Sequence, residues 1–271
     1  MSKNEETREE SLIRVAKMYE QDAVARENRY LNEYYSVKRG FVLGDIASLP
    51  EVRGLKCYFI DDNSHGLKQN FYVSCKLLMA SQKEAEPGGN VFAAYQPFLY
   101  GLLSDSPEIY DWLAHAELKD KDYVKGPQFM FHQFQLVLLR DDEALRETIS
   151  IVARKGGNRV KKLAAAGQDF FSLLLKQDKE ALQAFIEDAA KAKYADEWVG
   201  QFLAGFAVIF AKLCWYRGIE VKIQNPLVPM SLIPIQPLHS YDVEYDFLRP
   251  GWTPPTPPGV VTKIKRWFRR G

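Results

Sequence analysis

The segment DFFSLLLKQD at residues 169–178 is followed by CWYRGIEVKI at residues 214–223 and by NPLVP at residues 225–229. In the first piece, and in the stretch that leads to the second, apolar residues recur at the three- and four-residue spacing of a buried helix face. Gly218 is typical of a helix stop, because glycine tolerates positive φ. The prolines that follow preclude long regular elements. This order predicts two packed helices and then a proline-punctuated segment.

Helical spacing continues on both sides of this stretch. Residues 7–36 predict one long helix. Shorter helices are expected at residues 67–84, 90–103, 107–118, 127–139, 143–154, 158–175, 179–193 and 197–217. Between residues 40 and 63, glycines and a proline interrupt the pattern, so a short strand at residues 56–60 or an irregular connection is expected there. The predicted fold class is mainly all-α, with stacked antiparallel helices or helical hairpins.

The chain changes character after its last predicted helix. Residues 219–223 alternate apolar and polar side chains, which predicts a short strand. Four prolines at positions 226–237 then favour a loop that wraps the helical body. We therefore expect a single helical domain over residues 1–248 and a separate C-terminal piece over residues 249–271.

The C-terminal piece combines a proline-rich linker with a basic amphipathic tail. The linker, residues 249–259, is expected to be extended and solvated. In the tail, Ile264, Trp267 and Phe268 lie at helical spacing among lysines and arginines. Three roles stay open for it: a short helix that touches anionic lipid or nucleic acid, a segment that docks on the acidic body, or a disordered end.

A helix, an aspartate turn and a second helix occur twice along the chain. Residues 134–145 align with residues 170–182 at an offset of 36 that becomes 37 after one inserted residue. Such an offset suits stacked helical hairpins, although helical proteins also produce this similarity by composition alone. The alignment places Asp142 and Asp178 as helix caps, each stabilising by about 1 kcal/mol. Ser106, before a proline, predicts a third cap.

Charge is distributed unevenly along the chain. The net charge is +1, but the residues from Arg249 onwards include six basic side chains and no acid, so residues 1–248 carry −5. Nucleic-acid binding depends mainly on neutralising phosphates with lysine and arginine. The acidic body therefore argues against nucleic acid as a ligand and favours a protein partner with a basic surface.

Three features predict the compartment. Cys57, Cys75 and Cys214 are odd in number and widely spaced, which favours free thiols under reducing conditions. The N-terminus carries both charges and no apolar stretch, so no secretory signal is expected. The longest apolar stretch, residues 202–211, ends at Lys212 and is shorter than the ~20 residues of a membrane-spanning helix. We predict a cytoplasmic protein without stable membrane insertion.

The sequence offers little that is typical of catalysis. Paired acids at residues 61–62, 120–122 and 141–142 favour helix caps or solvated charge over general acid–base work. Neither a GxSxG nor a GxxxxGK[ST] segment occurs. The histidines lie far apart and lack partners at metal-ligand spacing: His65, His115, His132 and His239. We predict a binding protein with no metal, no cofactor and no enzymatic activity.

Four segments carry a family resemblance. They are Leu103-Ser-Asp105-x-x-Glu108, Phe170-Phe171-x-Leu-Leu-x-x-x-Asp178, Tyr216-Arg217-Gly218-Ile219-x-Val221 and Pro226-Leu-Val-Pro229-x-x-Leu232. Through them, roughly residues 100–240 resemble bacterial immunity proteins of polymorphic toxin systems, specifically the immunity 49 family.

The resemblance implies an all-helical cytoplasmic protein that binds and neutralises a cognate antibacterial toxin by occlusion. Such toxins often arrive by a contact-dependent or type VI secretion route, and the resemblance implies no catalytic residues. An acidic body is compatible, because electrostatic complementarity raises the rate of association with a basic toxin. The candidate contact residues are acids near helix ends that we expect to be exposed: Asp105, Glu108, Asp111, Asp120 and Asp122.

Two other classes of function stay open. A helical-repeat scaffold would bind peptides in a concave groove, and several partners of similar affinity would favour it. An enzyme would be indicated by loss of turnover on substitution of Asp61, Asp62 or His65.

Overall fold

The computed structural model describes residues 6–85, 91–191 and 199–256. Over these residues the chain is helical and forms no strand, which confirms the predicted all-α class of stacked helices. The helices are α1 (Arg8–Asn32), α2 (Arg39–Phe59), α3 (Ser64–Glu84), α4 (Gln96–Ser104), α5 (Pro107–His115), α6 (Pro127–Leu139), α7 (Asp142–Lys155), α8 (Asn158–Ala166), α9 (Phe170–Lys176), α10 (Lys179–Ala190) and α11 (Gly205–Tyr216). Short 3₁₀ turns lie at Val91–Ala93, Val199–Gln201, Met230–Leu232 and Asp246–Leu248.

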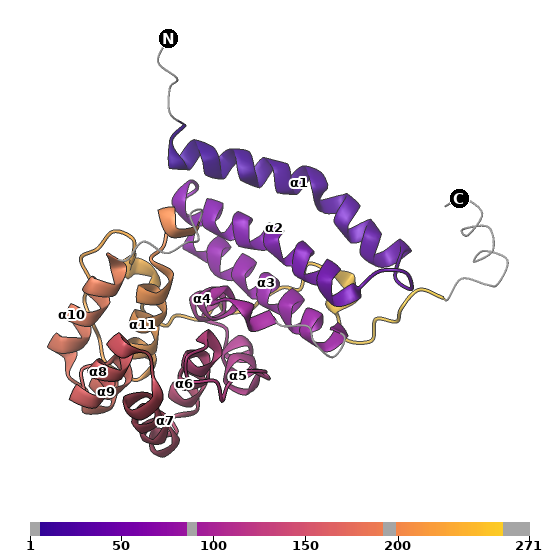
Figure 1. Cartoon of the computed structure of the whole chain (residues 1–271). Helices are drawn as coiled ribbons and strands as arrows, with labels where there is room; N and C mark the ends of the chain where they lie inside the picture. The colour runs from indigo at the N-terminus through magenta and orange to yellow at the C-terminus, as the bar shows by residue number, and fades with distance from the viewer. Residues whose placement is uncertain (1–5, 86–90, 192–198, 257–271) are drawn as a thin grey trace, which may run out of the picture.

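Three long helices form one side of the molecule. In Figure 1, α1, α2 and α3 lie side by side. The shorter helices α4 to α11 lie on the side away from α1, where α4 packs on α3. Thr7 begins α1 with a capping box, in which its side chain accepts from the Glu10 amide and the Glu10 carboxylate accepts from the Thr7 amide. The buried face of α1, including Leu12 and Ala16, then packs on α2, which in turn packs on α3.

The expectation of a strand or irregular connection between residues 40 and 63 is wrong, because α2 occupies most of that region. Its glycines serve close packing rather than chain breaks. A Cβ at Gly54 would lie 2.7 Å from the Phe71 ring of α3, so only glycine lets the two helices approach this closely. The apolar face of α2 is buried almost throughout, and this tertiary packing overrides the weak helix propensity of Gly and Pro50.

Aromatic rings fill the core between the shorter helices. Phe134 of α6 lies 5.9 Å, centroid to centroid, from Phe171 of α9. Phe170 lies 4.3 Å from Phe210 of α11. Offset and tilted ring pairs of this kind add to the stabilisation from apolar burial. The segment that dominated the sequence pattern, residues 169–178, is thus central to the core.

The structure divides one predicted helix and does not confirm one predicted cap. The single helix expected at residues 158–175 is divided into α8 and α9 by Gly167, which has a φ of +64°. Asp169 then caps α9 by accepting from the Phe171 and Ser172 amides. Ser106 is buried and directly precedes α5, but its side chain makes no capping hydrogen bond, so the predicted serine cap is wrong.

The helix–turn–helix unit occurs twice, and equivalent residues of the two turns are 37 positions apart. Arg140 and Gln177 end the first helix of each unit in the left-handed conformation. The next residue caps the second helix: Asp141 accepts from the Ala144 amide at 3.0 Å, and Asp178 from the Ala181 amide at 3.1 Å. The prediction of Asp178 as a cap is confirmed, whereas Asp142 is the first helical residue and pairs with Arg217 instead.

The strand predicted at residues 219–223 is not confirmed, although the alternation that suggested it is real. Apolar Ile219, Val221 and Ile223 are buried while the residues between them are exposed. Side chains of α10 replace a partner strand: Gln183 accepts from the Lys222 amide at 2.9 Å, and Glu187 accepts from the Gln224 amide. The segment is therefore extended without a ladder.

The proline-punctuated segment wraps back across the long helices. It contacts α2 through a hydrogen bond between Ser231 and Tyr58, and α3 through Gln69, whose side chain pairs with the Asp242 backbone. Farther on, Trp252 packs near Tyr30 and Tyr34, so the first part of the predicted linker lies against α1. The predicted basic tail, residues 260–271, lies outside the described residues.

None of the helices described is both long enough and apolar enough to cross a bilayer. The most apolar of the described helices, α11, has twelve residues.

Candidate functional site

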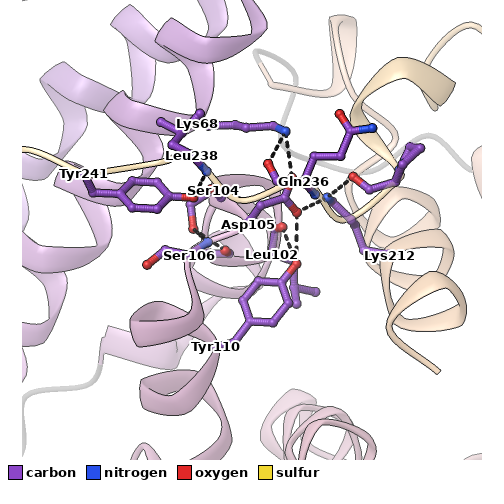
Figure 2. Close-up of polar contacts among 12 residues, drawn as sticks. Lys68, Leu102, Ser104, Asp105, Ser106, Tyr110, Lys212, Gln236, Leu238 and Tyr241 are labelled. Carbon is purple, nitrogen blue, oxygen red and sulfur yellow. Dashed lines mark hydrogen bonds and ion pairs between the residues drawn. The ribbon is translucent and has the colours of Figure 1, made fainter. Parts of the chain in front are cut away.

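Asp105 lies in the interior rather than on the surface, so its predicted role as an exposed contact residue is wrong. It ends α4 in the left-handed conformation, and its side chain is 0% exposed. Lys212 of α11 forms an ion pair with one carboxylate oxygen, and Lys68 of α3 pairs with the other at 2.9 Å. Figure 2 shows both ammonium groups pointing at this one carboxylate.

Neutral donors complete the surroundings of Asp105. Tyr110 donates to the carboxylate at 3.2 Å and to the Leu102 carbonyl at 2.8 Å. Burial, with the adjacent carboxylate, raises the pKa of the Tyr110 hydroxyl, so it stays protonated and donates. The backbone N–H of Gln236, in the proline-punctuated segment, donates to the Asp105 carboxylate at 3.2 Å. A buried charge that is paired and hydrogen-bonded in this way is tolerated in a core.

The two lysines also hold the wrapping segment in place. Lys68 donates to the Gln236 carbonyl at 2.7 Å, and Lys212 reaches the Pro234 carbonyl at 3.4 Å. Nearby, the Tyr241 hydroxyl donates to the Ser104 carbonyl at 2.7 Å. We call Lys68, Asp105, Tyr110 and Lys212 the buried ionic cluster. The cluster joins α3, α4, α5 and α11 to the proline-punctuated segment at Pro234 and Gln236 (Figure 2).

Lys212 has the altered acidity that often marks a reactive group. Burial lowers the pKa of its ammonium to about 8, although the Asp105 carboxylate opposes that shift. Perturbed pKa values also occur in structural ion pairs. The exposure of the side chains decides whether Lys212 is a reactive group or part of a structural ion pair. The side chains of Lys212 and Asp105 are both 0% exposed, so the ion pair offers no reactive atom to a substrate.

The other four predicted acids are exposed, as expected. Glu108 and Asp111 are on α5, and Asp120 and Asp122 follow on the α5–α6 loop, residues 116–126. Glu108 is 49% exposed but is held by an ion pair with Lys76 and a hydrogen bond from Tyr72 at 2.9 Å. Asp111 is freer, with a side chain that is 78% exposed.

Buried glutamines fix the α5–α6 loop. Gln128 accepts from the Asp120 amide at 2.9 Å and donates to the Phe92 carbonyl at 3.2 Å. Gln135 donates to the carbonyls of Leu113 and Ala116, at 3.0 and 2.7 Å. These side-chain amides satisfy backbone groups at the end of α5 and in the loop that no helix pairs, so they anchor the loop to α6.

The tip of the loop presents an aromatic side chain between charges. Tyr123 is 62% exposed and follows directly after Asp122. Two turns hold it: the Tyr123 amide donates to the Asp120 carbonyl at 3.0 Å, and the Gly126 amide donates to the Tyr123 carbonyl at 2.8 Å. A Cβ at Gly126 would lie 2.7 Å from the Tyr123 ring, so a glycine at this position lets the ring approach the Gly126 backbone closely.

We define the α5–α6 surface as Glu108, Asp111, Asp120, Asp122 and Tyr123. Five acids and three lysines lie between residues 108 and 125, so this surface has a small negative charge. Exposed, preorganised loops with an aromatic residue and surrounding polar groups are typical of protein contact sites, where tyrosine often contributes much of the binding energy. The arrangement suits recognition of a protein and contains no constellation for bond-breaking chemistry.

Several important residues were missed at the sequence level. Lys212 was interpreted as the end of an apolar stretch, yet α11 continues past it and buries it. The sequence did contain a signal for this burial: Lys212 is a single lysine in a helix that is apolar on every side. Such a lysine needs a buried carboxylate as its partner. Tyr123 and the glutamines gave no comparable signal, since their roles depend on contacts between distant segments.

The remaining titratable groups form no metal site in the part of the chain that is described. No three His, Cys, Asp or Glu side chains gather closely enough there to hold a metal ion. His132 is partly buried on α6, and its Nδ1 atom has no hydrogen-bond partner within the structure. His115 pairs with Asp111 of its own helix.

The described residues form an all-helical protein, and the comparison with known families agrees with the expected class. The sequence model of the family described as Immunity protein 49 matches residues 121–232. The chain is therefore similar to this immunity-protein family from the α5–α6 loop to the turn after α11, as the resemblance predicted. The match includes Asp122 and Tyr123 and leaves Glu108, Asp111 and Asp120 outside. No curated protein and no solved structure matches the chain.

Proposed function

We propose that this protein is an immunity protein that binds a cognate antibacterial toxin and neutralises it by occlusion in the cytoplasm. The similarity of residues 121–232 to the Immunity protein 49 family is the observation that carries the proposal. In this account the protein has no catalytic step of its own. The toxin reaches the cell by a contact-dependent or type VI secretion route, and binding covers the toxin surface that it needs for activity.

The α5–α6 surface is the proposed contact with the toxin. Its support is geometric: Asp120, Asp122 and Tyr123 lie on a loop whose backbone is hydrogen-bonded to buried glutamines, which lowers the entropy lost on binding. The acids around Tyr123 favour a basic region on the toxin, because complementary charge accelerates association. The exposed side chain of Asp111, which pairs only with the exposed His115 of its own helix, extends this region along α5.

Capture from the native cells tests the proposal. The tagged full-length protein is recovered, washed with salt, and analysed by mass spectrometry for whatever remains bound. Immunity predicts a single stoichiometric partner that is toxic when expressed alone and harmless when this chain is present. Many weak partners of similar abundance would favour the helical-repeat scaffold instead, and turnover of a small molecule by the purified chain would favour an enzyme.

Charge reversal tests the proposed contact. We expect Asp120→Lys with Asp122→Lys to leave the fold intact, because both side chains are exposed, and to weaken toxin binding about tenfold or more. Titration calorimetry measures the affinity and circular dichroism the fold. Glu33→Lys with Glu220→Lys is the matched control, since these exposed acids lie elsewhere and make no described side-chain contact. Equal affinity of both variants would remove the α5–α6 surface from the account.

A further inference from the structure

A second exposed surface carries the opposite charge. Residues 148–168 include five basic side chains and no acid, although residues 1–248 as a whole are acidic. These basic residues lie at the end of α7 and along α8, and all are exposed: Arg154, Lys155, Arg159, Lys161 and Lys162. We call them the α7–α8 surface.

The charges of this surface are largely unpaired. Arg159 approaches Asp188 at 3.6 Å, but both side chains are mostly exposed, so the pair contributes little. Arg154 donates only to the Ser150 carbonyl of its own helix, at 3.3 Å. Among the described residues, Lys155, Lys161 and Lys162 have no ion-pair partner. Intramolecular pairing therefore does not account for the concentration of basic residues.

The shape of α8 favours close approach by a partner. Asn158, Lys161, Lys162, Ala165 and Ala166 fall on one exposed side of the helix by their spacing. The alanines keep that side low, so a flat surface can reach the lysines without displacing other long side chains. At its first turn, the exposed Val160 adds an apolar contact next to the charges.

The α7–α8 surface is continuous with the α5–α6 loop. A small apolar cluster, separate from the main core, is formed by Phe129 of α6, Val152 of α7 and Ala164 of α8. Val124, which follows Tyr123 in the loop, packs against this same cluster. The loop and the α7–α8 pair are thus two sides of one local unit. The loop carries acids and lysines in equal number, whereas the α7–α8 surface is uniformly basic.

We propose that the α7–α8 surface binds an acidic region of the same toxin that the α5–α6 surface contacts, which rests on the proposed function. Two adjacent surfaces of opposite charge fix the orientation of the partner, because a rotated complex brings like charges together. A folded protein presents patches of both signs and fits this arrangement. A DNA duplex is stiff, so phosphates bound at α8 bring neighbouring phosphates towards Asp120 and Asp122, whereas a flexible acidic segment of a protein can turn away from them.

The test compares Lys161→Glu with Lys162→Glu against a matched control, Lys17→Glu with Lys38→Glu, in the full-length chain. Lys17 and Lys38 are exposed and lie on the α1–α2 side. Stopped-flow mixing with the captured toxin measures the association rate at several ionic strengths. We expect the α8 variant to associate about tenfold more slowly at low salt and the control to match the wild type. Equal rates for wild type and α8 variant would overturn the inference while leaving immunity intact.

Two defined probes keep the inference testable if the wild type captures no toxin, which would contradict the proposed function itself. Labelled poly-glutamate and a labelled DNA duplex of equal charge are each titrated against the wild type and both variants. We expect poly-glutamate to bind the wild type and the control, and to lose binding with the α8 variant. Binding of poly-glutamate that is unaffected by the α8 substitutions would contradict the inference, as would tighter binding of the duplex than of poly-glutamate.

Discussion

At the residue scale, Asp105 determines how two lysines are tolerated in the core. Its carboxylate is the one acidic group that contacts both Lys68 and Lys212 in the described structure. We expect Asp105→Asn to lower the free energy of unfolding by about 3–5 kcal/mol, because it leaves two buried ammonium groups without a counter-charge. Lys212→Met should cost less, since Asp105 keeps Lys68 and the loss of one buried charge removes its desolvation cost. Urea unfolding measures both, and a larger loss for Lys212→Met would contradict this order.

The acidity of Lys212 gives a prediction for pH. Burial lowers its pKa in the folded protein to about 8, from 10.5 in an unfolded chain. Between these values the unfolded state binds more protons, so the contribution of Lys212 to stability rises as pH increases. The wild type should therefore gain stability relative to Lys212→Met between pH 8 and pH 10.5. Urea unfolding of both proteins across this window checks the sign, and a constant difference would show that the pKa of Lys212 does not fall on folding.

The sequence could predict single residues only where the role is local. Asp178 was found because a cap depends on its own turn and the next three residues. Asp105 was misplaced because its role depends on Lys68 and Lys212, which are far away in the chain. The acidic residues of the α5–α6 loop were placed correctly near a helix end, but the glutamines that fix them act across helices.

At the element scale, the repeated helix–turn–helix unit depends on its caps. Asp141→Ala and Asp178→Ala should each lower the free energy of unfolding by about 1 kcal/mol, because each leaves a first-turn amide without its acceptor. Glu143→Ala is the matched control, as an exposed acid in the same first turn without a described side-chain contact. Chemical unfolding distinguishes them. A cost for Asp141→Ala no larger than that for the control would refute the assignment of the cap.

Helical spacing predicted the helices well where one face is apolar, and α6 spans the residues expected of it. The errors have physical causes. Glycines of α2 looked like chain breaks but create close contact with α3, as Gly54 and Phe71 show. The alternation at residues 219–223 gave the correct buried face, yet pairing with Gln183 and Glu187 of α10 replaces a strand. Local pattern identifies a buried face but not the element that covers it.

At the scale of the whole molecule, charge is arranged by surface rather than by net value. The net charge of the body suggested a basic partner, but it averaged over the α5–α6 surface and the α7–α8 surface, which differ in sign. Both adjoin one small apolar cluster, and the wrapping segment is held elsewhere by the buried ionic cluster. The proposed binding region is thus separate from the residues that stabilise the fold, so substitutions in one leave the other measurable.

The most direct test of immunity is the survival of cells that express the captured partner with and without this chain. The account predicts growth arrest with the partner alone and full growth when the wild-type chain is present. Asp120→Lys with Asp122→Lys should give reduced protection, whereas Glu33→Lys with Glu220→Lys should protect like the wild type. A partner that is harmless alone, or one that arrests growth although the complex forms, would contradict the proposal that this protein neutralises a toxin by occlusion.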